Sequence, residues 1–248
     1  MHRFHIPPGT ANGAEVLLSP EESHHALRVL RLGIGDAVTL LDGAGVEARG
    51  TILAVDKRAV RVGVHERIVH PPLPCAVTLF QALPKGRLMD TIVEKATELG
   101  AARIVPLLTE HTISRPDDDH AVSKLEQWRT TALEAVKQCG NPWLPRIESP
   151  VTFAEPLRRN ERVDLALVAS LHPGARPLRA VFEEFQAREQ RRPATLAVWV
   201  GPEGDFTPEE IKALVQSGVQ PITLGCLVLR CDTAAVATLA LAMNEAVG

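Results

Sequence analysis

Strand-like and helix-like segments alternate along residues 76–247, and this alternation limits the possible folds more than any other feature of the chain. Short runs rich in Val, Leu, Ile and Ala are typical of buried parallel strands, and the longer segments between them are typical of covering helices. The pattern therefore predicts an α/β fold with a parallel sheet. We expect strands at 76–83, 103–108, 163–170, 194–200 and 221–225, and helices at 87–99, 122–139, 177–188, 208–217 and 233–247.

A different pattern precedes this region. A short strand at 16–18 leads to Ser19-Pro20, which combines a good N-cap with proline in the first helical turn and predicts a helix ending near Gly33. Strands are expected at 37–42, 46–55 and 59–69, which together suggest a small β-barrel. The stiff run Pro71-Pro72-Leu73-Pro74 marks the boundary, so we expect domains at residues 1–72 and 73–248.

Composition excludes several classes of protein. Aromatic residues make up only 4% of the 248 residues and tyrosine is absent, which argues against a surface that binds RNA by stacking bases on aromatic rings. The 27 basic and 30 acidic residues give a net charge of −3, so any RNA partner must be held by local basic patches. No run of 18 apolar residues and no apolar signal core occur, so we expect no membrane association.

Cysteine usage bears on metals and on location. The four cysteines are scattered, without the paired spacing that binds zinc, so no metal site is expected. Free thiols in a chain of this size are typical of a reducing compartment, which predicts a cytoplasmic protein.

The loop Gly201-Pro202-Glu203-Gly204 follows an expected strand, at the edge where open α/β sheets bind ligands. Neither a dinucleotide-binding nor a Walker glycine pattern is present, and Glu209 and Glu210 fill the start of the next helix. Two carboxylates there would repel a phosphate. A ligand without phosphate, such as a nucleoside joined to an amino acid, fits this loop, although a simple tight turn accounts for the glycines equally well.

Cations at three places could meet an anionic partner. Arg230 lies between an apolar loop and the last helix, where a guanidinium could stabilise developing negative charge or simply lie on the surface. Lys85 and Arg87 flank a helix start, which suggests either an anionic partner or a solvated turn. Arg28 and Arg31 share a helix face with His24 and could contact backbone phosphates.

Taken together, these segments resemble one family, the bacterial 16S ribosomal RNA (uracil-N3) methyltransferases of the SPOUT class. The resemblance covers nearly the whole chain, with its motifs in the family's order. The motifs are His24-His25-x-x-Arg28-Val29-Leu30-Arg31, Lys85-Gly86, Lys95-Ala96-Thr97-Glu98-Leu99-Gly100, Gln138-Cys139-Gly140, Gly201-Pro202-Glu203-Gly204, and Leu224-Gly225 with Leu229-Arg230 and Thr233-Ala234.

The resemblance implies a PUA-like RNA-binding barrel, then a parallel sheet with a C-terminal trefoil knot, and a homodimer. It implies methylation of uridine N3 in 16S ribosomal RNA or the small ribosomal subunit with S-adenosylmethionine, and it makes Arg230 and Glu203 the catalytic candidates. The implied cofactor residues are Ala169, Leu171, Gly201, Pro202, Glu203, Gly204, Leu224, Gly225, Leu227, Leu229 and Thr233. The implied RNA-binding residues are Arg3, His24, Arg28, Arg31, Lys85 and Arg87.

The sequence departs from the family pattern at several positions. Asp205 replaces a usual glycine, Cys226-Leu227 replaces Pro-Arg, and Cys231-Asp232 replaces Thr-Glu. His111 and Asn141 occupy positions that are often arginine. These changes affect RNA contacts more than the cofactor site. Two rival functions stay open, namely a SPOUT enzyme that methylates another RNA position and a non-catalytic RNA-binding factor in ribosome assembly.

Overall fold

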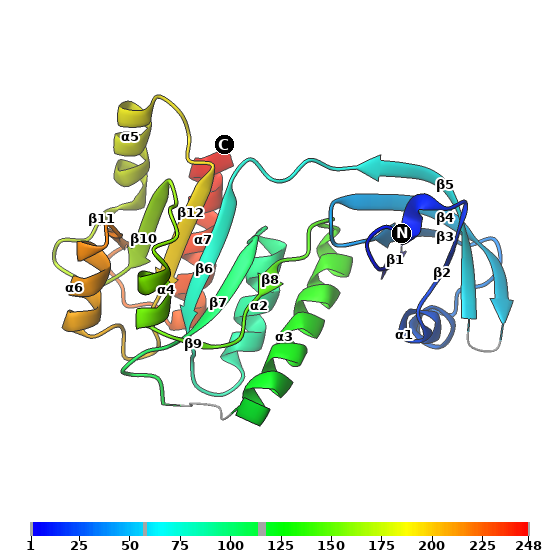
Figure 1. Cartoon of the computed structure of the whole chain (residues 1–248), viewed down its shortest axis with the longest axis horizontal. Coiled ribbons are helices and arrows are strands. Elements are labelled where there is room, and N and C mark those ends of the chain that lie inside the picture. The colour runs from blue at the N-terminus through cyan, green and yellow to red at the C-terminus, as the bar shows by residue number, and fades with distance from the viewer. Residues whose placement is uncertain (1, 57–58, 114–117, 248) are drawn as a thin grey trace. The chain divides into compact units, whose positions relative to one another are not determined.

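The computed structural model describes residues 2–56, 59–113 and 118–247, which form two compact units (Figure 1). Unit 1 comprises Met1–Pro72 together with Leu133–Leu144, and unit 2 comprises Leu73–Ala132 together with Pro145–Gly248. The expected boundary after residue 72 treats 73–248 as one domain, whereas the structure packs residues 133–144 with the N-terminal part.

Unit 1 is built on a five-stranded sheet in the order β1-β3-β4-β5-β2. Strand β1 pairs with β3 in parallel, and the other neighbours are antiparallel. Phe4, Ile6, Leu40 and Ile52 are buried at its core. Its elements are β1 (His2–His5), the 3-10 turn η1 (Thr10–Asn12), β2 (Glu15–Leu17), α1 (Pro20–His24), the π-helical turn η2 (His25–Val29), β3 (Ala37–Leu41), β4 (Val46–Asp56) and β5 (Ala59–Val69).

The helix predicted after Ser19 is confirmed, and the Ser19 hydroxyl accepts a hydrogen bond from the Glu22 amide at 3.2 Å. The structure divides this helix into α1 and the wider turn η2, which the spacing of apolar residues did not indicate. Strand β1 was also not expected from the sequence, because four residues are too few to show a periodic pattern.

Residues 133–144 complete unit 1 through buried polar contacts. The Lys137 ammonium lies 3.0 Å from the Glu22 carboxylate, and both side chains are almost fully buried. Arg3 donates to the carbonyl oxygens of Lys137 and Gln138, at 3.1 and 2.8 Å. Burial alone would lower the pKa of Lys137, but the hydrogen bonds from its ammonium to Glu134 and Glu22 outweigh that effect and raise it.

Unit 2 contains a sheet in the order β11-β13-β10-β12-β6-β7-β8, with β9 also paired to β7, and every pair is parallel. The expected parallel α/β architecture is confirmed. Its elements are β6 (Ala76–Ala82), α2 (Leu88–Glu98), β7 (Arg103–Leu108), α3 (Asp118–Cys139, whose last residues belong to unit 1), β8 (Arg146–Ile147), β9 (Val151–Thr152), α4 (Ala154–Arg159), β10 (Leu165–Ala169), β11 (Arg176–Pro177), α5 (Leu178–Glu189), β12 (Thr195–Val200), α6 (Pro208–Gln216), β13 (Gln220–Thr223) and α7 (Cys231–Val247).

Helices cover both faces of this sheet, as continuous apolar strands require. On one face Phe80 and Trp199 stack with their ring centroids 4.2 Å apart and form a core with Leu157 of α4 and Leu214 of α6. Helix α7 packs against β12, β6 and α2, and Figure 1 shows it behind the sheet, with α4 in front. The two helical layers leave the ends of the strands open for ligands.

The Lys137–Glu22 pair gives a test of unit 1. The Lys137→Met variant leaves the Glu22 carboxylate buried and unpaired, so we expect it to lose about 3–5 kcal/mol of unfolding free energy in urea titrations. Adding Glu22→Gln should restore most of that loss. The Glu134→Gln variant removes the exposed partner of the same ammonium at 2.7 Å and should cost less than about 1 kcal/mol. A loss below about 1 kcal/mol for Lys137→Met would contradict this account.

Candidate functional site

The carboxyl ends of three adjacent strands surround one cavity in unit 2. Ala169, at the end of β10, lies opposite Val200 in β12 and Ile222 in β13, so the three strands end at the same edge. We call this site the strand-end cavity. It is lined by Ala169, Ser170, Leu171, Val200, Gly201, Pro202, Glu203, Asp205, Thr223, Leu224, Gly225, Leu227, Val228, Leu229, Cys231 and Ala234.

The structure brings nearly all the predicted cofactor residues to this cavity. Only Gly204 and Thr233 of that set are not in its lining. Gly204 lines a neighbouring cleft, and Thr233 lies in the first turn of α7 with its side chain exposed. Sequence reasoning did not name Val200, Asp205, Thr223 or Ala234 among the cofactor residues, although all four line the cavity. Each directly follows or precedes a residue that it did name.

Apolar side chains on the rim of the cavity are exposed to an unusual degree. Leu171, Leu227 and Val228 are 61%, 74% and 78% exposed. Grouped exposed apolar residues mark a surface that binds another molecule. Gly225 lies between them with φ 125°, and a Cβ placed there would meet no atom within 4 Å. The cavity therefore offers an apolar rim and open backbone, which suits an uncharged ring system.

The loop after β12 is held in one shape by its own hydrogen bonds. The Asp205 amide donates to the Pro202 carbonyl at 3.0 Å, and Asp205 takes a left-handed conformation with φ 58°. A Cβ at Gly201 would lie 2.8 Å from the Asp205 carboxylate, so glycine is required there. Thr207 and Glu210 then form a reciprocal capping box at the start of α6.

Glu203 joins two loops at this edge. Its carboxylate accepts a hydrogen bond from the Lys85 amide at 2.9 Å, which connects the loop after β12 to the loop after β6. Its side chain is exposed, and the residue borders both the strand-end cavity and a second cleft. In the structure Glu203 therefore orders the loops around the cavity.

Arg230 is exposed and only weakly held. Its side chain is 75% exposed, and its Nε lies 3.7 Å from the Asp232 carboxylate. Its carbonyl accepts from the Ala234 amide at 2.8 Å, and α7 begins at the next residue, Cys231. Asp232 and Thr233 thus lie inside α7, which begins two residues before the expected start at residue 233. Arg230 is not in the lining of the strand-end cavity but immediately follows the lining residue Leu229.

A second cleft lies beside the first and is named here the His111 cleft. It is lined by Lys85, Glu110, His111, Thr112, Ile113, Glu203 and Gly204. His111 Nδ1 lies 2.9 Å from the Asp205 carbonyl oxygen, and a Cβ at Gly204 would lie 3.3 Å from the same nitrogen. The hydrogen bond to Asp205 is the main cause that raises the pKa of His111. Sequence reasoning noted His111 only as a departure from a family pattern.

A further hollow over the sheet face between α4 and α5 is lined by polar groups that already have partners. Asp164 in its wall accepts from Arg191 at 2.7 Å and from the Ala194 amide at 2.7 Å. The Arg191 guanidinium beside Asp164 holds the pKa of that carboxyl well below its usual range. These hydrogen bonds stabilise the fold around the hollow.

The predicted RNA-binding residues lie on both units. In unit 1, His24, Arg28 and Arg31 are exposed, and Arg3 is half-buried, where it caps α3. In unit 2, Lys85 and Arg87 are exposed at the start of α2.

The described residues contain no cluster of His, Cys, Asp and Glu that could hold a metal ion. Within the same part of the chain, no helix has the length and hydropathy needed to span a membrane. Burial raises the pKa of the Cys231 thiol to about 11, so the cysteine in the cavity wall stays protonated and is a poor nucleophile near neutral pH.

Comparisons with known proteins agree with this architecture. A family model described as an RNA methyltransferase domain matches residues 71–243, and one described as an RNA methyltransferase PUA domain matches residues 18–64. Ribosomal RNA small subunit methyltransferase E from Synechocystis is 34% identical over 96% of this chain and 76% of its own length. The Bacillus subtilis protein of that name is 30% identical over 88% of this chain and 85% of its own length.

Two solved structures share the whole fold. A methyltransferase from Legionella pneumophila with bound cofactor SAM is 31% identical and covers 98% of this chain and 96% of its own, with a TM-score of 0.87. Ribosomal RNA small subunit methyltransferase E from Neisseria gonorrhoeae was solved with bound S-adenosyl methionine and is 27% identical. It covers 98% of this chain and 97% of its own, with a TM-score of 0.86. The predicted fold class, a PUA-like domain followed by a parallel-sheet domain, is confirmed, while the knot stays a prediction.

The bond between Glu203 and Lys85 can be tested by hydrogen exchange. The Glu203→Ala variant removes the acceptor, so exchange of the Lys85 amide should become about three- to tenfold faster, as one net hydrogen bond predicts. The melting temperature should hardly change, because both groups are exposed. The Glu209→Ala variant removes a nearby carboxylate and should leave Lys85 exchange at the wild-type rate. Unchanged exchange in Glu203→Ala would show that the bond does not order the loop.

Proposed function

This chain belongs to the RNA methyltransferase family, and we propose that it transfers the methyl group of S-adenosylmethionine to N3 of a uridine in 16S ribosomal RNA. The observation that carries the proposal is the strand-end cavity, which gathers most of the residues expected to hold the cofactor. Relatives at 34% and 30% identity are named as small-subunit ribosomal RNA methyltransferases, which supports the choice of RNA.

The residues of the strand-end cavity fit a nucleoside joined to an amino acid. The exposed rim of Leu171, Leu227 and Val228 offers apolar surface for a base, and the backbone at Gly225 is open to close approach. Glu209 and Glu210 lie in the first turn of α6, where they disfavour a ligand with phosphates. When bound, S-adenosylmethionine supplies a methyl group that its positive sulfur has already activated, so no metal is needed.

The chain's own residues must then prepare the uridine. Neutral N3 carries a proton and is a poor nucleophile, so the site has to remove that proton and stabilise charge that spreads onto O2 and O4. Arg230 is suited to the second role because it is exposed, permanently cationic and next to the cavity. Glu203 supports the site by fixing the loops that face the base. Positioning should supply much of the rate.

We assign RNA delivery to exposed basic side chains on both units. His24, Arg28 and Arg31 in unit 1 and Lys85 and Arg87 in unit 2 would contact phosphates, which fix position rather than sequence. Arg3 is already hydrogen-bonded to the end of α3, so any contact that it makes with RNA would come from that fixed position. A ribosomal RNA substrate supports the predicted cytoplasmic location.

The proposal also includes the trefoil knot around the strand-end cavity and a homodimer. Leu241 and Val247 are exposed on α7, and a second subunit would cover this apolar surface.

Two glycines with positive φ and open space around the Cβ position test the cofactor site. Gly225 and Gly218 have φ 125° and 93°, and a Cβ at either would meet no atom within 4 Å. Alanine at each should cost about 1–2 kcal/mol of stability. Only Gly225→Ala adds a methyl group inside the strand-end cavity, so calorimetry should show S-adenosylmethionine affinity at least about tenfold weaker for that variant alone. Equal affinity for the two variants would refute the assignment.

Arg230 gives the test of catalysis. The Arg230→Ala variant should lower single-turnover methylation about 10²–10³-fold, the usual effect of losing one electrostatic donor, while S-adenosylmethionine affinity stays unchanged. The Arg230→Lys variant keeps the charge but loses the planar fork, so it should recover activity only in part. A lower melting temperature with normal turnover per folded molecule would instead mean that Arg230 is structural.

Mapping modified nucleotides in ribosomal RNA from a deletion strain tests the whole proposal. Loss of one 3-methyluridine from 16S ribosomal RNA, restored by the gene, is the expected result. Loss of a different methylated nucleotide would show a methyltransferase acting elsewhere on RNA. No change in modification, together with an assembly defect, would show a non-catalytic RNA-binding factor.

A further inference from the structure

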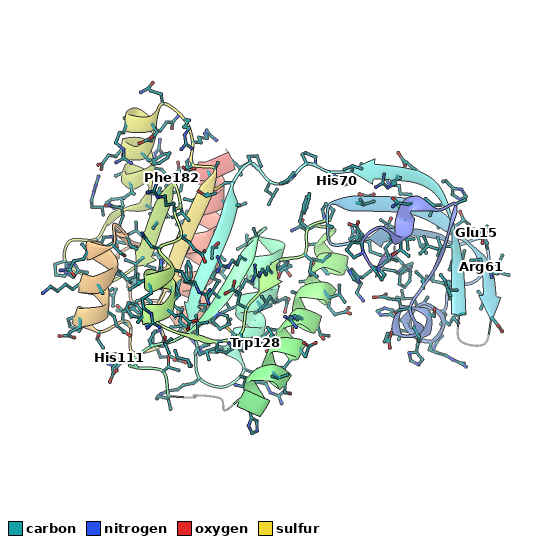
Figure 2. The ribbon with its side chains drawn as sticks, viewed as in Figure 1. Glu15, Arg61, His70, His111, Trp128 and Phe182 are labelled. Atoms are coloured by element: carbon teal, nitrogen blue, oxygen red, sulfur yellow. The ribbon has the colours of Figure 1, made fainter. Side chains whose placement is uncertain are left out.

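We propose that His111 is the catalytic base that takes the proton from uridine N3, and that the His111 cleft holds the target base. This inference rests on the proposed function and assigns the proton acceptor that the reaction requires. The cleft and the strand-end cavity share Glu203, so a base in one lies beside a cofactor in the other. Figure 2 labels His111 at the edge of unit 2 toward which strand β6 points.

A tight turn after β7 holds His111 in place. The Thr109 amide donates to the Thr112 hydroxyl at 2.9 Å, and the Thr112 amide donates to the Thr109 carbonyl at 3.1 Å. The Glu110 amide donates to Glu210 at 3.0 Å, which anchors the turn to the capping box of α6. The imidazole is thus presented on a supported backbone, as precise proton transfer requires.

The hydrogen bond to Asp205 decides which ring nitrogen can accept a proton. A carbonyl oxygen only accepts, so Nδ1 of His111 carries the hydrogen. In the neutral ring the lone pair is then on Nε2. The hydrogen bond to Asp205 engages Nδ1 and not Nε2, and the residue lines the cleft. The neutral histidine therefore offers an available lone pair where the base would lie.

The other groups of the cleft are less suited to this role. The Lys85 ammonium is a donor without a lone pair, and the Glu203 carboxylate already accepts from the Lys85 amide. The Thr112 hydroxyl is buried and bonded to Thr109. A carboxylate such as Glu110 is a much weaker base than imidazole.

The charges around His111 tune it for work near neutral pH. The Asp205 carbonyl is the main cause that raises its pKa above the usual 6.5, and the carboxylates of Glu210 and Glu110 add to that effect. The charged groups around the ring are Glu110 beside it, Lys85 in the loop after β6, Glu203 and Asp205 in the loop after β12, and Glu210 in the first turn of α6. A catalytic base works best when its pKa is near the working pH.

The step balances without any further reactant. The N3 proton moves to Nε2 of His111, and the N3 electron pair forms the new bond to the methyl carbon. The electrons of the carbon–sulfur bond return to sulfur, which leaves neutral S-adenosylhomocysteine and 3-methyluridine. The His111 imidazolium then releases its proton to water.

Two substitutions of His111 distinguish a role as proton acceptor from a role as a positive charge alone. The His111→Asn variant can still donate to the Asp205 carbonyl, and His111→Arg keeps a positive charge, but neither has a basic nitrogen with a free lone pair. Both should lower kcat/KM for RNA about 10²–10⁴-fold at pH 7, the usual contribution of acid–base catalysis. Calorimetric S-adenosylmethionine affinity and melting temperature should stay near the wild-type values in both.

The pH dependence supplies the second readout. Wild-type kcat/KM should rise tenfold per pH unit and level off at the pKa that NMR titration gives for His111 in the free enzyme. Both variants should lose that plateau and keep gaining rate up to pH 9. Full activity of His111→Arg, or a wild-type plateau far from the NMR value, would overturn the proposal. A wild-type enzyme that forms no 3-methyluridine would instead overturn the proposed function, and the assignment of His111 with it.

Discussion

The site depends above all on the parallel pairing of β10 with both β12 and β13. Since parallel strands run in one direction, this pairing places the ends of the three strands side by side, with Ala169 opposite Val200 and Ile222. The loops that follow must then meet at one edge, where the strand-end cavity forms. The helical layers bury the sheet faces, so binding is directed to the strand ends.

Hydrogen bonds between loops turn this edge into a site with two compartments. Glu203 accepts from the Lys85 amide, and Asp205 accepts from His111, so the loop after β12 is joined to the loops after β6 and β7. That loop therefore forms the wall between the strand-end cavity and the His111 cleft. A transfer reaction needs this arrangement, because donor and acceptor must lie close together in a fixed geometry.

Local patterns in the sequence predicted the longer elements and the loop at Gly201, because strand and helix periodicity extends over many residues there. Short elements such as β1 and α4 carry no such pattern. The contacts that join distant residues were equally out of reach. The Lys137–Glu22 pair spans 115 residues and the His111–Asp205 bond spans 94, and neither leaves a trace in the local sequence. Family resemblance supplied most residues that line the strand-end cavity, but it did not assign His111 to a site.

The central claim is that the strand-end cavity holds S-adenosylmethionine, and hydrogen exchange with and without this ligand tests it most directly. The account predicts slower exchange in peptides covering residues 169–171, 201–205 and 223–231, with the hollow between α4 and α5 unchanged. Protection centred on residues 160–166, or no protection at saturating ligand, would contradict the claim.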